Sequence, residues 1–253
     1  MKVTVLGSGT AIPDGERGPA GFLLSLESTQ ILVDGGSGSL SRLSSLGVNP
    51  RSLDGGVYTH RHLDHTGDLA PLLFAMRVGG RLPQARDYPL WAGEGFGAFV
   101  AGLEALYPGW LNTADWRAQV QELSLKERDE AQLPGEIRLE TAPANHSAGA
   151  LHLSFSARGR RVVFSGDTGP SEALIELAKE ADLLICECAL PAEDPQVRHL
   201  WPEAVAEILV RARPRHALIT HFYPECDPEG AMSLLEATGV SVGRARDNQV
   251  VQL

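Results

Sequence analysis

The chain contains little cysteine. Its 253 residues include three, Cys186, Cys188 and Cys226. An odd number without a secretory leader indicates reduced thiols rather than a disulfide framework. Cys186 and Cys188 have C-x-C spacing in an apolar run. This differs from the C-x-x-C spacing of zinc or redox sites, so we expect small residues of the hydrophobic core.

Long apolar runs are also absent. No run reaches the roughly 18 residues that a transmembrane helix needs. The segment from Met1 to Gly7 lacks the charged region, apolar region and cleavage site of a signal peptide, and reads as a first strand. We therefore expect a cytoplasmic protein that does not use a membrane.

Positive charge is scarce. Lys and Arg number 22 against 32 Asp and Glu, which gives a net charge of −10. Such a chain is not a general binder of polyanions, because a long nucleic acid would need a local basic patch to overcome the overall field. The arginines at 158–161 and 211–215 are expected in solvated turns and at a helix end.

The pattern of strands and helices predicts one α/β domain over residues 1–253, and its length suits one large core. Residues 112–135 are polar with mixed charge, and we predict surface helix and loop there. Two packed sheets with helices outside are the expected architecture. We predict strands at 2–6, 21–27, 30–34, 55–59, 88–92, 136–142, 150–156, 161–165, 182–187, 216–220 and 249–253, and helices at 38–46, 67–78, 94–106, 171–180, 202–212 and 228–237.

The most informative segment is His60-Arg61-His62-Leu63-Asp64-His65, with four metal-capable side chains in six positions. Buried imidazoles and carboxylates need polar partners, and a divalent metal satisfies several of them at once. The alternation of His60 and His62 points both to one side, while Asp64 and His65 turn toward a neighbouring position. This spacing favours two metals over one.

Three further candidates lie in loops after predicted strands: His146, Asp167 and His221. Taken singly, a loop histidine is usually a surface or capping residue, and the Ser-Gly-Asp-Thr-Gly segment around Asp167 is typical of a turn. In this order, and with the His60–His65 segment upstream, they complete a ligand set.

The ordered set resembles the metallo-β-lactamase superfamily, whose pattern is an early Asp, H-x-H-x-D-H, a distant His, an Asp after a strand and a final His. The resemblance spans residues 3–253 and implies a four-layer αββα sandwich with two mixed sheets. It also implies that Asp34 orients ligands near the H-x-H loop. By the same resemblance His60, His62 and His146 would hold one ion, Asp64, His65 and His221 the other, and Asp167 would bridge them.

Glu187 and His199 narrow the resemblance to the RNase Z-like branch. RNase Z-type phosphodiesterases carry a Glu in an H-E-A-T segment and a His in an H-S-T segment, which are thought to move protons beside the metals. Here the flanks differ, because Cys186 stands for the His, Cys188 for the Ala and Leu200 for the Ser. The competing interpretation is a capping histidine and a buried structural glutamate.

A second departure concerns tRNA. RNase Z enzymes that mature tRNA usually carry a long Gly/Pro-rich arm between the single His and the bridging Asp, whereas 20 residues separate His146 from Asp167 here. The absence of the arm disfavours dedicated tRNA processing. The long stretch between His65 and His146, with Trp91, Phe96, Tyr107 and Trp110, would either wall a substrate cleft or belong to the core.

The resemblance thus implies a dinuclear hydrolase with two Zn²⁺ ions per chain, Mn²⁺ being the alternative metal. The ions would lower the pKa of a water to make a nucleophile, and Asp64 would orient or deprotonate it. His199, positioned by Glu187, would stabilise the transition state or protonate the leaving alkoxide. The expected substrate is a small phosphodiester or a short nucleic acid, and the resemblance implies a homodimer. Two alternatives remain: a thioester or lactone hydrolase, and a non-enzymatic member that binds a small molecule.

Overall fold

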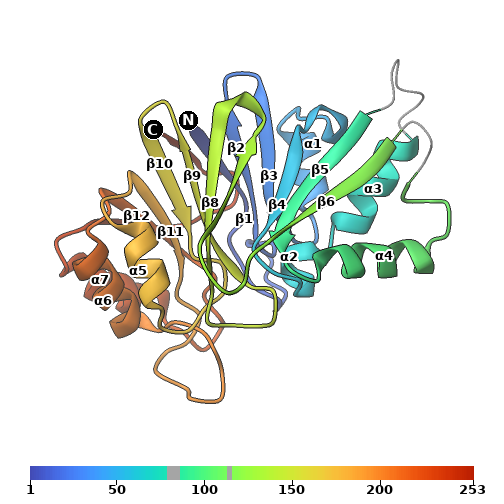
Figure 1. The fold of residues 1–253 in the computed structure, drawn as a ribbon. Coiled ribbons are helices and arrows are strands. Elements are labelled where there is room, and N and C mark those ends of the chain that lie inside the picture. The colour runs from blue at the N-terminus through green and yellow to red at the C-terminus, as the bar shows by residue number, and fades with distance from the viewer. Residues whose placement is uncertain (79–85, 113–115) are drawn as a thin grey trace.

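Two sheets face each other at the centre of the molecule, and helices cover their outer faces (Figure 1). The structure is a computed structural model, and it describes residues 1–78, 86–112 and 116–253. Within these residues each sheet has seven strands and contains both parallel and antiparallel pairs. The predicted αββα sandwich with two mixed sheets is confirmed.

The first sheet has the order β14-β1-β2-β3-β4-β5-β6. Neighbours from β14 to β3 are antiparallel, and neighbours from β3 to β6 are parallel. Its strands are β1 (Lys2–Gly7), β2 (Gly21–Leu26), β3 (Thr29–Gly35), β4 (Gly55–Tyr58), β5 (Arg86–Gly93), β6 (Trp116–Leu123) and β14 (Val250–Gln252).

The second sheet has the order β13-β12-β11-β10-β9-β8-β7. Neighbours from β7 to β10 are antiparallel, and those from β10 to β13 are parallel. Its strands are β7 (Asp129–Leu133), β8 (Ile137–Pro143), β9 (Leu151–Ala157), β10 (Arg160–Phe164), β11 (Leu183–Glu187), β12 (His216–Thr220) and β13 (Ser241–Arg244).

The helices form the two outer layers. Those from the N-terminal half lie on the side of the first sheet, and those from the C-terminal half cover the second (Figure 1). Among the described residues no helix has the length and apolar character needed to span a bilayer. The helices are α1 (Ser39–Ser45), α2 (Leu63–Thr66), α3 (Leu69–Val78), α4 (Phe96–Leu106), α5 (Glu172–Ala178), α6 (Pro202–Ala212) and α7 (Pro228–Glu236), with short 3-10 turns η1 (Pro50–Ser52) and η2 (Pro134–Glu136).

Three apolar clusters hold the four layers together. Successive side chains of a strand point to opposite faces. Phe22 and Leu24 of β2 therefore join the cluster between the sheets, while Leu23 joins the cluster under α3 and α4. Likewise Ile185 of β11 faces the other sheet, and Leu184 packs against α5 and α6. Strands buried on both faces explain why these segments read as continuous apolar runs.

The prediction for residues 112–135 was wrong. The described part of this stretch contains the strands β6 and β7 rather than a surface helix, while residues 113–115 lie outside the described residues. Both strands are edges of their sheets, and edge strands commonly carry charged residues because one side stays in water. In β7 only Ala131 and Leu133 are buried, so its apolar alternation is short. The sequence patterns also did not predict β13, which has no buried residue.

Parallel strands place their carboxyl ends at one edge of each sheet. The ends of β3 and β4 meet at one edge, and those of β8, β10, β11 and β12 meet at the facing edge (Figure 1). Backbone hydrogen bonds join the sheets there: Leu151 N–H donates to Thr59 O at 2.9 Å, and His221 N–H donates to Ser8 O at 3.2 Å. Loops at such an edge are the usual place for a binding site in α/β proteins.

Candidate metal centre

The histidines and aspartates of the predicted set lie at or just after a strand end, or in the short helix α2 that follows β4. Asp34 is near the end of β3, and His60 and His62 follow β4. His146 lies between β8 and β9, and Asp167 follows β10. The remaining members are Asp64 and His65 in α2, and His221 directly after β12.

Asp34 sets the proton positions of two histidines. It is 2 % exposed and accepts hydrogen bonds from Thr59 N–H at 2.7 Å and Thr59 Oγ1–H at 2.8 Å. Because that hydroxyl hydrogen is committed, Thr59 Oγ1 accepts from His60 Nδ1–H at 3.0 Å. His65 Nδ1–H donates to Asp34 Oδ2 at 2.8 Å. In its neutral form each imidazole therefore carries its proton on Nδ1 and leaves Nε2 free as a ligand atom.

The first set of ligand atoms comes from His60, His62, His146 and Asp167. His146 Nε2 lies 3.1 Å from His62 Nδ1 and 3.9 Å from Asp167 Oδ2, and His60 Nε2 lies 3.6 Å from the same carboxylate oxygen. His146 Nδ1–H donates to Arg198 O at 2.9 Å, which leaves Nε2 facing the others. His60 and Asp167 are buried, whereas His62 is exposed at the mouth of the site.

The second set comes from Asp64, His65, His221 and the same Asp167. His221 Nε2 lies 3.4 Å from Asp167 Oδ2 and 3.8 Å from Asp64 Oδ2. His65 Nε2 lies 3.2 Å from Asp167 Oδ1 and 3.7 Å from Asp64 Oδ2. In each set the ligand atoms lie within 4.8 Å of one another, and Asp167 is the residue that the two sets share.

A glycine admits Asp167 to this position. Gly166 has φ of +56°, and a Cβ there would lie 2.9 Å from Thr59 Cβ. Glycine is the residue that accepts both a positive φ and this close approach. The turn after β10 can therefore carry Asp167 against the H-x-H loop of the other sheet.

These residues fit a divalent metal ion. The Nε2 atoms of His60, His65 and His221 are buried and have no hydrogen-bond partner in the described part of the chain. Buried polar atoms are almost always paired, so three unpaired nitrogens aimed at two carboxylates need an explanation. Imidazole nitrogen and carboxylate oxygen are ligands that zinc and related metals take. The chain is therefore built for a divalent metal cofactor.

The charges of the site shift its pKa values in opposite directions. Burial lowers the pKa of His60 well below its usual range, and the neighbouring His65 adds to this. Burial also acts to lower the pKa of His65, but the carboxylates of Asp167 and Asp34 outweigh it and raise that pKa. The pKa of Asp167 is held well below its usual range because His221 and His65 outweigh the effect of burial. Asp167 is thus ionised, as a metal ligand must be.

Glu187 and His199 form a buried pair beside both sets. His199 Nδ1–H donates to Glu187 Oε1 at 2.9 Å, and this carboxylate also accepts from the backbone N–H groups of Thr168, Ala189 and Leu200. Burial acts to lower the pKa of His199, but the hydrogen bond and charge of Glu187 outweigh it and raise the pKa. The His199 ring lies 4.9 Å from the His146 ring and 5.9 Å from the His221 ring, between the two sets.

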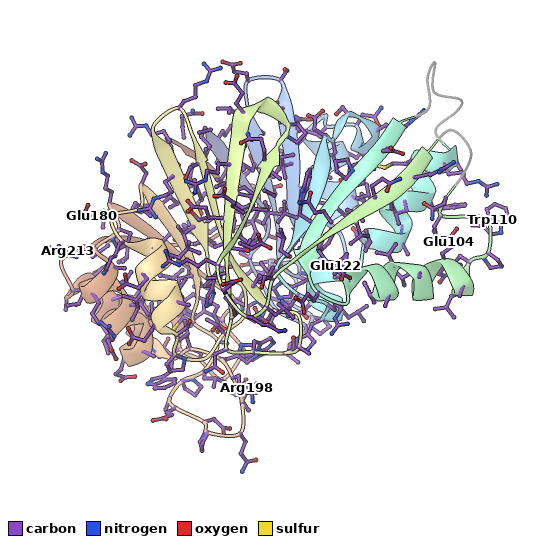
Figure 2. The ribbon with its side chains drawn as sticks, viewed as in Figure 1. Glu104, Trp110, Glu122, Glu180, Arg198 and Arg213 are labelled. Carbon is purple, nitrogen blue, oxygen red and sulfur yellow. The ribbon has the colours of Figure 1, made fainter. Side chains whose placement is uncertain are left out.

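Two residues near the site were not predicted from the sequence. The Tyr223 ring packs edge-on against His199 at 5.5 Å and His221 at 5.8 Å, and burial and nearby carboxylates raise its pKa to about 12. Arg198 donates to His146 O at 2.8 Å from the loop between β11 and α6, at the lower end of the sheets (Figure 2). Their nearness to His221 and His199 in sequence was the available signal.

Residues 147–166, between His146 and Asp167, hold the hairpin of β9 and β10. The two strands pair directly up to Ala157 and Arg160, so no arm projects from this hairpin. The four aromatic residues that were expected either to wall a cleft or to belong to the core fall into two groups. Trp91 and Phe96 are buried in the core, whereas Tyr107 and Trp110 are half exposed. Figure 2 shows Trp110 beyond the end of α4. A groove of about 480 Å³ there is lined by Ala70, Pro71, Phe74, Tyr107, Trp110 and Leu111.

Comparison with known proteins places this arrangement in a family. The model of the beta-lactamase superfamily domain matches residues 29–222. Ribonuclease Z of Mycobacterium avium (strain 104) is 30 % identical over 243 residues, covering 88 % of this chain and 86 % of that protein. The Bacillus subtilis (strain 168) protein named as the probable metallo-hydrolase YhfI is 28 % identical over 231 residues, covering 87 % of this chain and 86 % of that protein.

Solved structures share the fold. The crystal structure of YhfI from Bacillus subtilis, described as a metallo-beta-lactamase fold protein, superposes with a TM-score of 0.84 at 22 % identity and covers 99 % of this chain and 98 % of that chain. The short form of human tRNase Z superposes with a TM-score of 0.79 at 22 % identity, with 100 % and 99 % coverage.

Proposed function

The chain belongs to the metallo-β-lactamase superfamily and is a metal-dependent hydrolase of its RNase Z-like branch, and from this premise we propose that it is a dinuclear-metal phosphodiesterase. The observation that carries the phosphodiester assignment is the Glu187–His199 pair, because it supplies an oriented proton donor beside the shared Asp167. The ligand sets alone serve hydrolysis of several bond types.

Seven side chains would hold the metals. His60, His62 and His146 surround one position, Asp64, His65 and His221 the other, and Asp167 belongs to both. Two Zn²⁺ ions bound there, or Mn²⁺ in their place, would supply a nucleophile by lowering the pKa of water and would offset the charge that grows on a phosphoryl group.

The protein groups have separate tasks. Asp64, 9 % exposed, orients or deprotonates the attacking water while it remains a ligand. Glu187 fixes His199 through Nδ1, so the proton that His199 can give to the leaving alkoxide is the one on Nε2. The raised pKa of His199 favours the protonated form that this role requires. Glu187 itself is held by three backbone N–H groups, so it acts as an anchor.

The substrate that fits is a small phosphodiester or a short nucleic acid. The relative from Mycobacterium avium is named a ribonuclease, which supports phosphodiester chemistry. The tight β9–β10 hairpin and the net charge of −10 argue against a grip on a large RNA. A cytoplasmic homodimer remains our expectation, which sedimentation equilibrium and cell fractionation test.

The reaction is tested with bis-p-nitrophenyl phosphate on metal-replete protein, with a chelator-treated sample as the control. We expect turnover that the chelator abolishes and that added Zn²⁺ or Mn²⁺ restores. A thioester and a lactone substrate are assayed alongside. Hydrolysis of either of these with no phosphodiesterase activity would refute the phosphodiester assignment and leave the hydrolase family intact.

The role of His199 is tested with His199→Ala. We expect kcat to fall on the order of 100-fold or more, as for loss of a general acid, with metal content unchanged. The matched control is His216→Ala. His216 is the first residue of β12, at the opposite end of that strand from His221. In the described residues its side chain forms a hydrogen bond with Ser241 alone. Loss of metal in His199→Ala would make His199 a ligand and overturn the assigned role.

A further inference from the structure

The backbone of His221 is held by a residue from the other end of the chain. His221 has a φ of +62°, a backbone conformation that residues other than glycine rarely adopt. Ser8 O, in the loop after β1, accepts from His221 N–H at 3.2 Å and from Thr220 Oγ1–H at 3.1 Å. These two bonds hold the backbone at the point where the imidazole of His221 turns toward Asp64 and Asp167.

Ser8 is held in turn by Asp247. Asp247 Oδ1 accepts from Ser8 N–H and from Ser8 Oγ–H, each at 2.8 Å. Its side chain is 7 % exposed, and its charge is balanced by the Arg42 guanidinium at 2.5 Å. A buried carboxylate with a paired cation and backbone N–H donors forms strong, directional hydrogen bonds. The segment Gly7-Ser8-Gly9-Thr10, which resembles a phosphate loop in sequence, therefore serves here to receive this carboxylate.

The second oxygen of Asp247 closes a loop beside the site. Asp247 Oδ2 accepts from Gly18 N–H at 2.8 Å, and Gly9 N–H donates to Gly18 O at 2.7 Å. Residues 9–17 thus form a loop whose two ends meet at one carboxylate. A Cβ at residue 18 would lie 2.2 Å from Arg42 Nη1, so a larger residue there would displace the guanidinium that pairs with Asp247.

Asp247 is not needed to attach the C-terminal strand. Asn248 N–H donates to Val5 O at 2.8 Å, and Val5 N–H donates to Gln249 O at 2.9 Å. Pairing of β1 with β14 continues from there along the strand. The carboxylate oxygens of Asp247 instead accept from Ser8 and Gly18, and Ser8 is the residue that contacts His221.

We propose that Asp247 is a positioning residue for the second ligand set: through Ser8 it holds the His221 backbone in the conformation that brings its imidazole to Asp64 and Asp167. The proposal rests on the proposed function, because it takes His221 as a metal ligand. It assigns to Asp247 no contact with substrate or metal.

The test is Asp247→Asn, which keeps the shape but places an NH₂ donor against the N–H of Gly18 or the guanidinium of Arg42. We expect one of the two ions to bind about 10-fold or more weakly, as when a ligand loses its supporting residue, while the other ion keeps its affinity. Metal per chain is measured by elemental analysis against a chelator series. In the metal-free protein we expect faster hydrogen exchange at the His221 amide.

The matched control is Asp182→Asn. Asp182 is also largely buried, accepts from Arg161 N–H at 2.8 Å and contacts Arg160 and Arg215, but it precedes β11 at the end away from the site. We expect both ions to stay bound as in the wild-type protein.

Three results would count against the proposal. If Asp247→Asn keeps both ions at wild-type affinity and the His221 amide stays protected, Asp247 does not position this ligand. If Asp182→Asn weakens the same ion equally, the effect is general destabilisation and the proposal also fails. If the wild-type protein does not bind two ions, the proposed function itself is refuted.

Discussion

The two halves of the chain contribute to the metal centre in different ways. The N-terminal half delivers four metal-capable side chains from one segment, His60 to His65, after a single strand. The C-terminal half delivers His146, Asp167 and His221 one at a time, from loops after three different strands. The first contribution depends on local spacing, whereas the second depends on the register of a whole sheet.

The supporting residues follow the same division. Asp34 lies 25 positions from Thr59 and 31 from His65, and it acts within the first sheet. Asp247 lies 239 positions from Ser8 and reaches His221 only through that residue. A ligand brought by one local segment needs few supports, while a ligand brought by a separate strand needs a long-range contact for its backbone.

Asp167 is where the two contributions meet, so Asp167→Ala should have the largest effect. It removes an oxygen from both sets of ligand atoms and leaves the buried Nε2 atoms of His60 and His221 without their carboxylate. We expect kcat/KM to fall by more than about 1,000-fold, beyond the usual cost of removing one transition-state donor. Both ions should be lost in elemental analysis.

The contrasting variant is His62→Ala, which removes a ligand of one set only from an exposed position. This variant should lower the affinity for one ion and leave the affinity for the other unchanged. If Asp167→Ala lost a single ion in the same way, Asp167 would not be shared and the two halves would hold their metals independently.

His152 tests the C-terminal half alone, through the pH dependence of stability. It is fully buried, and its Nδ1–H donates to Ser165 O at 2.6 Å, so Nε2 accepts from Ser171 Oγ–H at 2.9 Å. Burial lowers its pKa from 6.5 to about 4. Below pH 6.5 His152 therefore becomes protonated in the unfolded chain while it stays neutral in the folded chain. Stability is fully present above pH 6.5 and falls as the pH drops toward 4.

The loss reaches about 3 kcal/mol at pH 4, at 1.36 kcal/mol for each unit of the shift. Urea unfolding at pH 7, 5.5 and 4 is compared between the wild-type protein and His152→Gln, which does not titrate. We expect the difference in free energy of unfolding between the two to narrow by this amount. A constant difference at all three pH values would show that His152 is protonated equally in both states.

The same comparison explains what sequence could and could not predict. The His60–His65 segment was identified by spacing alone, and His146, Asp167 and His221 were identified because a family pattern supplied their order. Tyr223 and Asp247 were missed, since neither lies in a motif and their contacts are set by the folded sheets. Strands β6 and β7 were missed for a related reason: as edges they are polar, and their pairing with β5 and β8 outweighs weak local preference.

Asp34→Asn tests the local support of the N-terminal half. The amide would turn a donor toward Thr59 or His65, so the ring orientation of His60 and His65 would no longer be specified. We expect metal affinity to fall about 10- to 100-fold, with folding retained, in competition titrations with a chromophoric chelator. The affinity for both ions should fall, because His60 and His65 belong to different sets of ligand atoms.

The control for that variant is Asp68→Asn. Asp68 accepts from Gly38 N–H at 3.0 Å and Leu40 N–H at 2.9 Å at the start of α1. It is an aspartate of the same half that supports backbone rather than a ligand. Unchanged affinity in Asp34→Asn would mean that the histidines are oriented by packing alone.

The smallest expected effect is the difference in stability cost between removing two helix N-caps of the C-terminal half. Ser171 caps α5 by accepting from Leu174 N–H at 3.2 Å, and Asp227 caps α7 by accepting from Gly230 N–H at 3.0 Å. Asp227→Ala should cost about 1 kcal/mol in the free energy of unfolding. Ser171→Ala should cost roughly 1 kcal/mol more, because it also leaves the buried Nε2 of His152 without a donor. Equal costs in urea unfolding at pH 7 would mean that the Ser171–His152 hydrogen bond adds nothing to stability.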